Sequence, residues 1–283
     1  MSEAIASRAR SRRTGPPSID AHAVLVIGSL VMLFPFAWQL IASFSTQGDV
    51  TAIPPHLLPS EPHPETYPAV FAQLPFVSQA AVSVTITVLR VLGQVIFGSM
   101  AGYAFARMPF PGRNIIFGFV LAILMVPPQV FLISQYQIIQ ALGWLNSIPG
   151  IVAPGLFSAF AAFLMRQFFL GLPEDLEEAA RLDGANAFQV FWRVMLPLAV
   201  PGLSALVVIG VLASWNDLLW PLVVATQPGS QPLSVGLATL QGQFTTNYPV
   251  LMAAALLAAA PILVIFLIMQ RRVIDGLAFS GIK

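Results

Sequence analysis

Acidic side chains gather in one short stretch of an otherwise apolar sequence. Between Pro173 and Pro197 lie five of the twelve acidic residues, in a chain that is 57% hydrophobic. The stretch opens with a proline and acidic residues, which suit the first turn of a helix and its positive dipole end. Gly184 is typical of a left-handed helix stop, and Asn186 with Gln189 predicts a capping box for a second helix. We therefore expect two short helices, joined by a sharp turn and facing water.

Two further ionisable residues, Arg90 and Asp217, interrupt long apolar runs. If those runs span a membrane as helices that rise about 1.5 Å per residue, Arg90 lies about 16 Å and Asp217 about 9 Å from the end of its own run, with both ends on the same side of the membrane. An unpaired charge in hydrocarbon is costly, so such residues usually pair or line a polar cavity. Mutual neutralisation and a polar lining are both compatible with this spacing.

The residues that most catalytic mechanisms require are missing from this chain. The only lysine is the last residue, so a phosphate-binding Gly-Lys-Ser/Thr loop is absent. None of the three histidines belongs to a His-Glu-x-x-His zinc motif, and cysteine is missing altogether. A pair of carboxylates buried in a span is also lacking, because Asp217 is the one acidic residue inside an apolar run. The sequence predicts a protein that is not an enzyme.

Composition predicts an all-α, polytopic membrane protein. The 283 residues have a mean hydropathy of +0.81 and only 9% charged side chains, and the net charge of +1 gives no reason to expect nucleic acid as a partner. A helix needs about 20 apolar residues to cross a bilayer. Six runs meet that length, at about 23–44, 79–106, 115–138, 148–170, 199–223 and 249–270.

Basic residues predict how these six spans are oriented. Of the thirteen lysines and arginines, all but Arg90 fall in the tail 1–20, the turn 107–113, the central stretch 166–193 and the end 271–283. The alternate segments 45–78, 139–147 and 224–248 hold none. Positive loops stay in the cytoplasm. We therefore expect cytoplasmic tails at 1–20 and 272–283, a membrane domain at 21–271, and a cytoplasmic loop at 173–197.

Small residues and prolines predict details within the spans. Gly98, Gly102 and Ala106 recur every four residues, which places them on one helix face that a second helix can approach closely. Pro127–Pro128 and Pro261 remove backbone hydrogen bonds, so we expect kinks in the third and sixth spans.

The acidic stretch resembles the "EAA" loop of bacterial ABC importer permeases. Glu178-Ala179-Ala180, Gly184 and Leu196-Pro197 match that loop in residue type and spacing. The run Phe163–Phe169 before it is similar to the second permease of maltose-type, binding-protein-dependent carbohydrate importers, as is Trp215–Leu222 after it. The resemblance covers most of the chain from about residue 20. Arg90 departs from the family, which usually keeps this span apolar.

The resemblance implies a type I ABC importer transmembrane fold in the plasma membrane, with a cytoplasmic coupling helix pair. It implies that the solute is a sugar, oligosaccharide or glycerol-phosphate-like compound and that it moves by alternating access. The implied partners are a second permease, two ATPase subunits that hold ATP and magnesium, and an extracytoplasmic binding protein. The residues expected to couple to the ATPase are Glu174, Glu177, Glu178, Ala179, Ala180, Asp183, Gly184, Leu196 and Pro197.

Two further sets of residues are candidates for contacts with solute and binding protein. Those expected along the substrate path are Arg90, Tyr136, Trp215, Asn216 and Asp217. The uncharged 226–248 loop resembles the family loop that reaches the binding protein, through Gln241, Gln243 and Thr245. The alternative is a secondary, ion-coupled transporter that uses Arg90 and Asp217, but it leaves the acidic helix pair unexplained.

Overall fold

The structure is a computed structural model that describes residues 19–242 and 245–279, and these residues are almost entirely helical. The one feature of β type among them is an isolated antiparallel bridge between Gln241 and Thr246. The helices are α1 (Ile19–Ser43), α2 (Gln47–Thr51), α3 (Thr66–Gln73), α4 (Phe76–Arg107), α5 (Arg113–Met125), α6 (Leu132–Ala141), α7 (Ile148–Val152), α8 (Ala159–Leu170), α9 (Asp175–Leu182), α10 (Ala187–Val190), α11 (Leu196–Leu198), α12 (Val200–Trp215), α13 (Leu219–Val224), α14 (Leu233–Thr239) and α15 (Tyr248–Phe279). The prediction of an all-α fold is confirmed.

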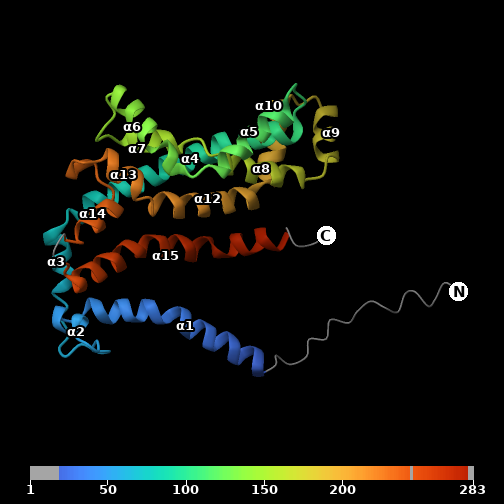
Figure 1. Cartoon of the computed structure of the whole chain (residues 1–283). Helices are drawn as coiled ribbons and strands as arrows, with labels where there is room; N and C mark the ends of the chain where they lie inside the picture. Colours follow the sequence, from blue (N-terminus) through green and yellow to red (C-terminus); the bar gives the residue numbers. More distant parts are fainter. Residues whose placement is uncertain (1–18, 243–244, 280–283) are drawn as a thin grey trace.

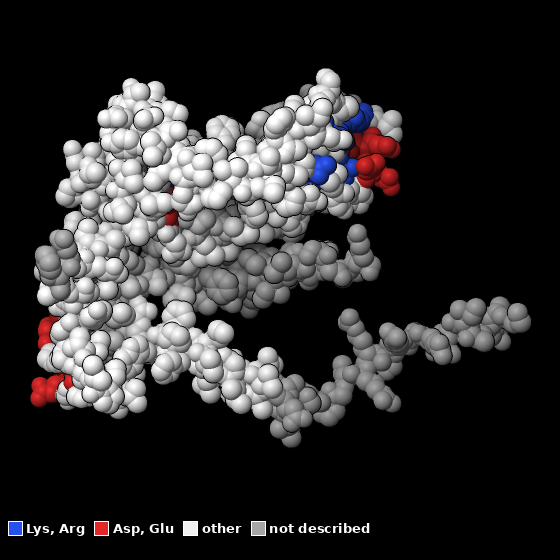
Figure 2. Space-filling view, in the orientation of Figure 1, with Lys and Arg blue, Asp and Glu red and all other residues white. Residues whose placement is uncertain are grey.

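The long helices lie side by side and the short ones collect at two ends (Figure 1). α4 packs against α8 and α12, α12 packs against α15, and α15 contacts α1 and α3. One end, here called the α9 end, carries α9 and α10, and the opposite α14 end carries α2, α3, α13 and α14. On the face shown in Figure 2, lysine and arginine appear only at the α9 end. Segments predicted to lie on the same side of a membrane therefore lie at the same end of the molecule.

Within residues 19–242 and 245–279, three helices are long and apolar enough to cross a membrane without interruption, namely His22–Ser43, Phe76–Arg107 and Tyr248–Ile265. Three bent pairs bring the possible total to six. The pairs are Arg113–Met125 with Pro128–Ala141, bent by 95°, Ile148–Gly155 with Ala159–Leu170, bent by 44°, and Ala187–Leu198 with Val200–Trp215, bent by 75°. The number of possible spans matches the sequence prediction, but half of them are not single helices.

Two prolines explain where one of the bent pairs breaks. The run expected at 115–138 turns at Pro127–Pro128, where two successive residues lack an N–H and α5 cannot continue. Pro261, in contrast, lies inside α15 without ending it, and the kink expected there stays a prediction. α15 also runs on to Phe279, so the tail predicted from 272 begins inside a helix. The N-terminal tail to residue 18 and residues 280–283 lie outside the described residues.

Small residues let α4 and α8 approach closely, as the sequence predicts. A Cβ added to Gly98 would lie 2.6 Å from the Cβ of Ala161, and one added to Gly102 would lie 2.6 Å from the Cβ of Met165. Such distances are too short for any larger side chain. Around this contact a buried cluster brings together α4, α8, the helices after α9, and α12; its members are Tyr103, Ala106, Ala161, Met165, Phe169, Val190, Phe191, Met195, Ala199 and Leu206. The core of the α9 end is thus built on α4.

Candidate functional site

The sharp turn after α9 is closed by two backbone hydrogen bonds. Gly184 has a φ of +86°, and its N–H donates to the carbonyl of Arg181 at 3.0 Å. The N–H of Ala185 donates to the carbonyl of Ala180 at 3.0 Å. This pair of bonds is the Schellman motif, which satisfies the last carbonyls of a helix and needs a left-handed residue at its centre. The predicted capping box then starts the next helix, since Asn186 and Gln189 bond to each other's backbone N–H at 2.9 Å.

Glu177 points into the protein and not toward solvent. Its side chain is 8% exposed. The hydroxyl of Tyr103 on α4 donates to Glu177 Oε1 at 2.9 Å, and Arg181 Nη2 donates to the same oxygen at 2.7 Å. Hydrogen bonding to Glu177 raises the pKa of Arg181, as expected for a cation next to a buried carboxylate. Glu177, expected from the sequence to couple to the ATPase, is thus held by its own chain.

Arg107 fastens the end of α4 to the same region. Its side chain is 6% exposed, and Nη1 lies 3.0 Å from Glu174 Oε1. The guanidinium also donates to the carbonyl of Phe169, at 2.7 Å from Nη2, and to that of Leu172. Phe169 lies in the last turn of α8 and Leu172 just beyond it, where carbonyls lack the usual helical donor four residues later. Arg107 therefore joins α4, α8 and α9, a role that no local sequence signal indicates.

The rest of the α9 end divides into an outer and an inner half. Glu178, Ala179, Asp183 and Pro197 are exposed, whereas Ala180 and Leu196 are half-buried. Figure 2 shows the acidic residues on the outer side of α9. Four large apolar side chains are also exposed here: Leu176 at 42%, Leu182 at 88%, Phe188 at 66% and Trp192 at 44%. The sequence predicts a helix pair facing water, but the second helix is embedded through Val190, Phe191 and Met195, which belong to the core.

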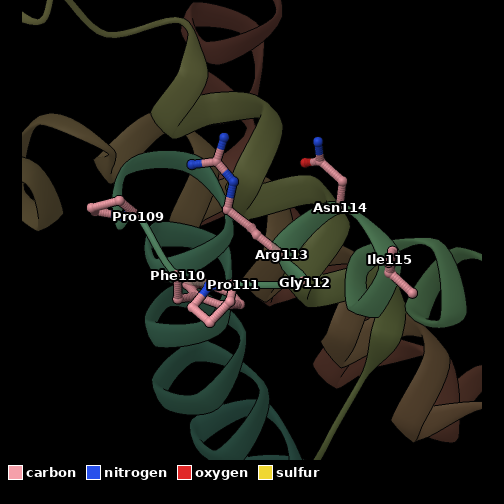
Figure 3. Close-up of a pocket in the computed structure, with 7 residues that line it drawn as sticks. All are labelled: Pro109, Phe110, Pro111, Gly112, Arg113, Asn114 and Ile115. Carbon is pink, nitrogen blue, oxygen red and sulfur yellow. The ribbon is translucent and has the colours of Figure 1, made fainter.

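A turn between α4 and α5 lies beside this surface, because Arg107 at its start contacts Glu174. The turn borders a shallow hollow lined by consecutive residues from Pro109 to Ile115 (Figure 3). In that view the side chains of Arg113 and Asn114 extend outward from the start of α5, away from Phe110 and Pro111. Gly112, with a φ of +77°, allows the chain to reverse here. The hollow holds a single charged side chain and no cluster of converging polar groups.

The second candidate site is centred on Arg90, where the structure brings the two intramembrane ions together. Arg90 Nη1 lies 2.7 Å from Asp217 Oδ2. Arg90 Nη2 donates to the carbonyl of Ile151 at 2.7 Å. Gly155 packs against the guanidinium, since an added Cβ would lie 2.7 Å from Arg90 Nε. Asp217 stands in the break between α12 and α13, and Ser234 donates to its freed carbonyl at 2.7 Å. The pair thus links α4, α7 and the broken fifth run.

A hollow of about 340 Å³ opens beside this ion pair; we call it the Arg90 hollow. Its lining comprises Arg90, Pro128, Gln129, Leu132, Gln135, Pro154, Gly155, Asp217, Leu219 and Trp220. The other expected path residues do not line it. Tyr136 is partly buried against Ile139 and its neighbours, and Trp215 donates to the carbonyl of Ala258 at 3.2 Å. Asn216 is exposed and bonds to Leu212 at 2.9 Å. Gln129, Gln135 and Trp220 were not expected, because only the bends bring them to Arg90.

At the α14 end, the loop expected to meet a binding protein is exposed and anchored. Gln241 and Thr245 are both exposed, and Gln243 lies outside the described residues. Gln47 bonds to the carbonyl of Thr246 and to the N–H of Tyr248, both at 2.9 Å. Nearby, hydrogen bonds from the Ser60 and Thr46 hydroxyls and from His56 hold the pKa of Asp49 well below its usual range. The loop is therefore attached to the segment that contains α2.

Sequence comparisons place relatives across most of the chain. Residues 94–277 match the family described as "Binding-protein-dependent transport system inner membrane component". The arabinooligosaccharides transport system permease protein AraQ of Halalkalibacterium halodurans is 39% identical over 201 residues, covering 71% of this chain and 72% of the relative. The sn-glycerol-3-phosphate transport system permease protein UgpE of Escherichia coli is 33% identical over 271 residues, covering 93% of this chain and 96% of the relative.

A solved structure shares the fold. It is a chain of a bacterial ABC transporter involved in the import of the acidic polysaccharide alginate. The TM-score is 0.78 at 25% sequence identity, and the match covers 89% of this chain and 95% of that one. The fold class expected from the sequence, an ABC importer transmembrane domain of type I, is confirmed.

The ion pair predicts a non-additive double-mutant cycle. Arg90→Ala strands a carboxylate and Asp217→Asn strands a buried guanidinium, so each should destabilise the protein by about 3–5 kcal/mol. The double variant should cost clearly less than the sum, because no charge is then left alone. Unfolding of the purified protein in detergent measures this, with the exposed Asn114→Ala as control. Full additivity would show that the two residues do not depend on each other.

Glu177 and its neighbour Glu178 should behave differently although they are adjacent. Glu177→Gln weakens bonds to Tyr103 and Arg181, and should loosen α9 by about 1.5–3 kcal/mol. Glu178→Gln changes an exposed side chain and should cost less than about 0.5 kcal/mol. Hydrogen exchange of the α9 amides reports both, with faster exchange expected only for Glu177→Gln and for Tyr103→Phe. Equal exchange in the Glu177 and Glu178 variants would contradict the anchoring role.

Proposed function

Because the chain belongs to the family of binding-protein-dependent transport system inner membrane components, we propose that it is the permease subunit of an ATP-driven importer for a sugar, oligosaccharide or related solute. Membership makes it a transport subunit and not an enzyme. The solute class is supported by relatives named for arabinooligosaccharides and glycerol phosphate, and by the alginate importer of similar fold. The observation that carries the proposal is the exposed outer face of α9 next to Glu177, which is fixed to α4.

The partners follow from the single coupling surface on this chain. One α9–α10 turn offers one docking place, so two ATPase subunits require two permeases. ATP and magnesium belong to the ATPases, since this sequence lacks a phosphate-binding loop. An extracytoplasmic binding protein delivers the solute to the α14 end, where Gln241 and Thr245 are exposed. Their uncharged side chains suit hydrogen bonding at such a contact.

Alternating access is supported by the connection between the two candidate sites. Arg107 and Arg90 are seventeen residues apart on α4, about 26 Å along an uninterrupted helix. At one position α4 is bonded to Glu174 and Phe169, and at the other to Asp217 and Ile151. When the ATPases close, a displacement of α9 reaches the Arg90 hollow through α4 as a rigid element. The chain thus supplies part of the solute path and the connection, through α4, between that path and the ATPase contact.

The orientation of the termini is part of the proposal. The α9 end carries Arg107, Arg113, Arg181 and Arg193, whereas the segments at the α14 end carry no lysine or arginine. Positive segments face the cytoplasm. We place the α9 end and both chain ends in the cytoplasm, and the protein in the inner membrane.

The secondary-transporter alternative is not supported. The family match indicates an importer that works with a binding protein. Ion coupling also needs an ionisable group free to take up and release its ion. Arg90 and Asp217 are bonded to each other at 2.7 Å and leave no such group between them.

Replacing Gly184 should uncouple the importer. A β-branched residue at φ +86° strains the turn by about 1–2 kcal/mol and shifts α9 relative to α10. Gly184→Val should lower binding-protein-stimulated ATPase activity in proteoliposomes while assembly is unchanged. Gly118→Val is the matched control, since that glycine lies in α5 with nothing within 4 Å of an added Cβ. Wild-type stimulation in the Gly184 variant would reject the proposed coupling role.

Cysteine labelling should report the proposed orientation directly. The native chain has no cysteine, so it contributes no background. Gln241→Cys should react with an impermeant maleimide applied outside intact cells with a permeable outer layer, because the residue is exposed. Asn114→Cys, at the other end, should react only after the inner membrane is opened. The reverse pattern would invert the topology.

A further inference from the structure

We infer that the Arg90 hollow is a solute subsite that accepts neutral, polyhydroxylated compounds and disfavours phosphorylated or carboxylated ones. The inference rests on the proposed function and narrows its solute class. It starts from the size and place of the hollow. At about 340 Å³, the hollow lies at the lower end of the range of about 300–1,000 Å³ for ligand sites. It is walled by α4, the bent third and fourth runs and the break before α13.

The charge that faces the hollow is negative, although the ion pair is neutral as a whole. The side chain of Asp217 is 25% exposed, whereas that of Arg90 is 8% exposed. Arg90 is enclosed from several sides: Nη1 is bonded to Asp217, Nη2 to the Ile151 carbonyl, and Nε faces Gly155. A ligand therefore meets the carboxylate before the guanidinium. For an anion to bind Arg90, the arginine would first have to leave Asp217.

The remaining polar groups of the hollow suit hydroxyls. Gln129 is exposed and Gln135 half-buried, and in residues 19–242 and 245–279 neither side-chain amide has a hydrogen-bond partner. An amide both donates and accepts, and a carboxylate accepts, which matches the donor and acceptor pattern of sugar hydroxyls. Trp220 adds an aromatic wall that is held in place, since its indole N–H donates to the Gly150 carbonyl at 3.3 Å. A few polar groups beside an apolar wall are typical of small-molecule sites.

Anionic solutes are disfavoured for a simple electrostatic reason. A phosphate or a uronate carboxylate in the hollow would stand next to the partly exposed carboxylate of Asp217, and like charges repel. The relatives do not decide this point, since their names include both arabinooligosaccharides and glycerol 3-phosphate. The geometry favours the neutral class.

Ligand-observed saturation-transfer NMR on the purified complex of this chain with its partner permease and ATPases tests the inference. Binding protein and nucleotide are left out, so that the membrane site alone is measured. The neutral probes are arabinotriose and galactotriose, and the anionic ones are trigalacturonate and glycerol 3-phosphate. At least one neutral probe should bind about tenfold more tightly than either anion. The double variant Gln129→Ala/Gln135→Ala should lose about tenfold in that binding, whereas Gln137→Ala, an exposed neighbour on α6 outside the lining, should not.

Three results would overturn the inference: tighter binding of an anionic probe, no binding of either neutral probe, or unchanged neutral binding in the double glutamine variant. The last would place the sugar on the partner permease. ATPase stimulation by the binding protein, measured on the same preparation, separates the two proposals. Normal stimulation with the wrong selectivity rejects the subsite alone, whereas absent stimulation in the wild-type complex rejects the proposed importer function.

Discussion

A charge buried in an apolar protein needs polar or oppositely charged partners close to it. Two arginines of α4 show how this requirement fixes the arrangement of several other helices. Arg90 holds the carboxylate of Asp217 and the carbonyl of Ile151, which come from separate runs of the sequence. Arg107 holds Glu174 and the last carbonyls of α8. Leaving either guanidinium without these groups would be costly in a medium where water cannot replace them. Through these bonds, α7, α8, α9 and the break before α13 are all fixed in position relative to α4.

The same constraint separates two kinds of carboxylate on α9. Glu177 is buried and bonded to Tyr103 and Arg181, while Glu178 is exposed. If α9 carried only exposed acidic residues, it would be attached to the rest of the chain by its turns alone. The inward carboxylate gives α9 a polar attachment to α4, and the embedded Phe191 and Met195 give the following helix an apolar one. Under the proposed coupling role, a force applied to the outer face would be passed to the membrane helices through these two attachments.

Three of the apolar runs are bent pairs of helices, and their breaks leave backbone groups that need other partners. The bends free backbone carbonyls that lipid cannot satisfy, so such groups are tolerated only where protein or water meets them. At the break before α13, Ser234 takes up the carbonyl of Asp217. At Gly155, the carbonyl accepts from Gln94 at 3.0 Å. Two of the breaks that border the Arg90 hollow are therefore satisfied by neighbouring helices, and the hollow combines a few polar groups with a largely apolar lining.

Sequence alone determined the features that depend on local chemistry. The apolar runs predict the membrane class and the all-α fold, because lipid permits few other structures. Gly184 and the Asn186–Gln189 box are right because left-handed turns and caps involve only neighbouring residues. The tertiary structure decided what depends on distant segments: that Glu177 faces inward, that Trp215 packs against α15, and that Gln129 and Trp220 reach Arg90. The sequence left open whether Arg90 finds Asp217 within the chain. Their meeting requires α4 and the unwound end of α12 to pack together, and no pattern within either run encodes that contact.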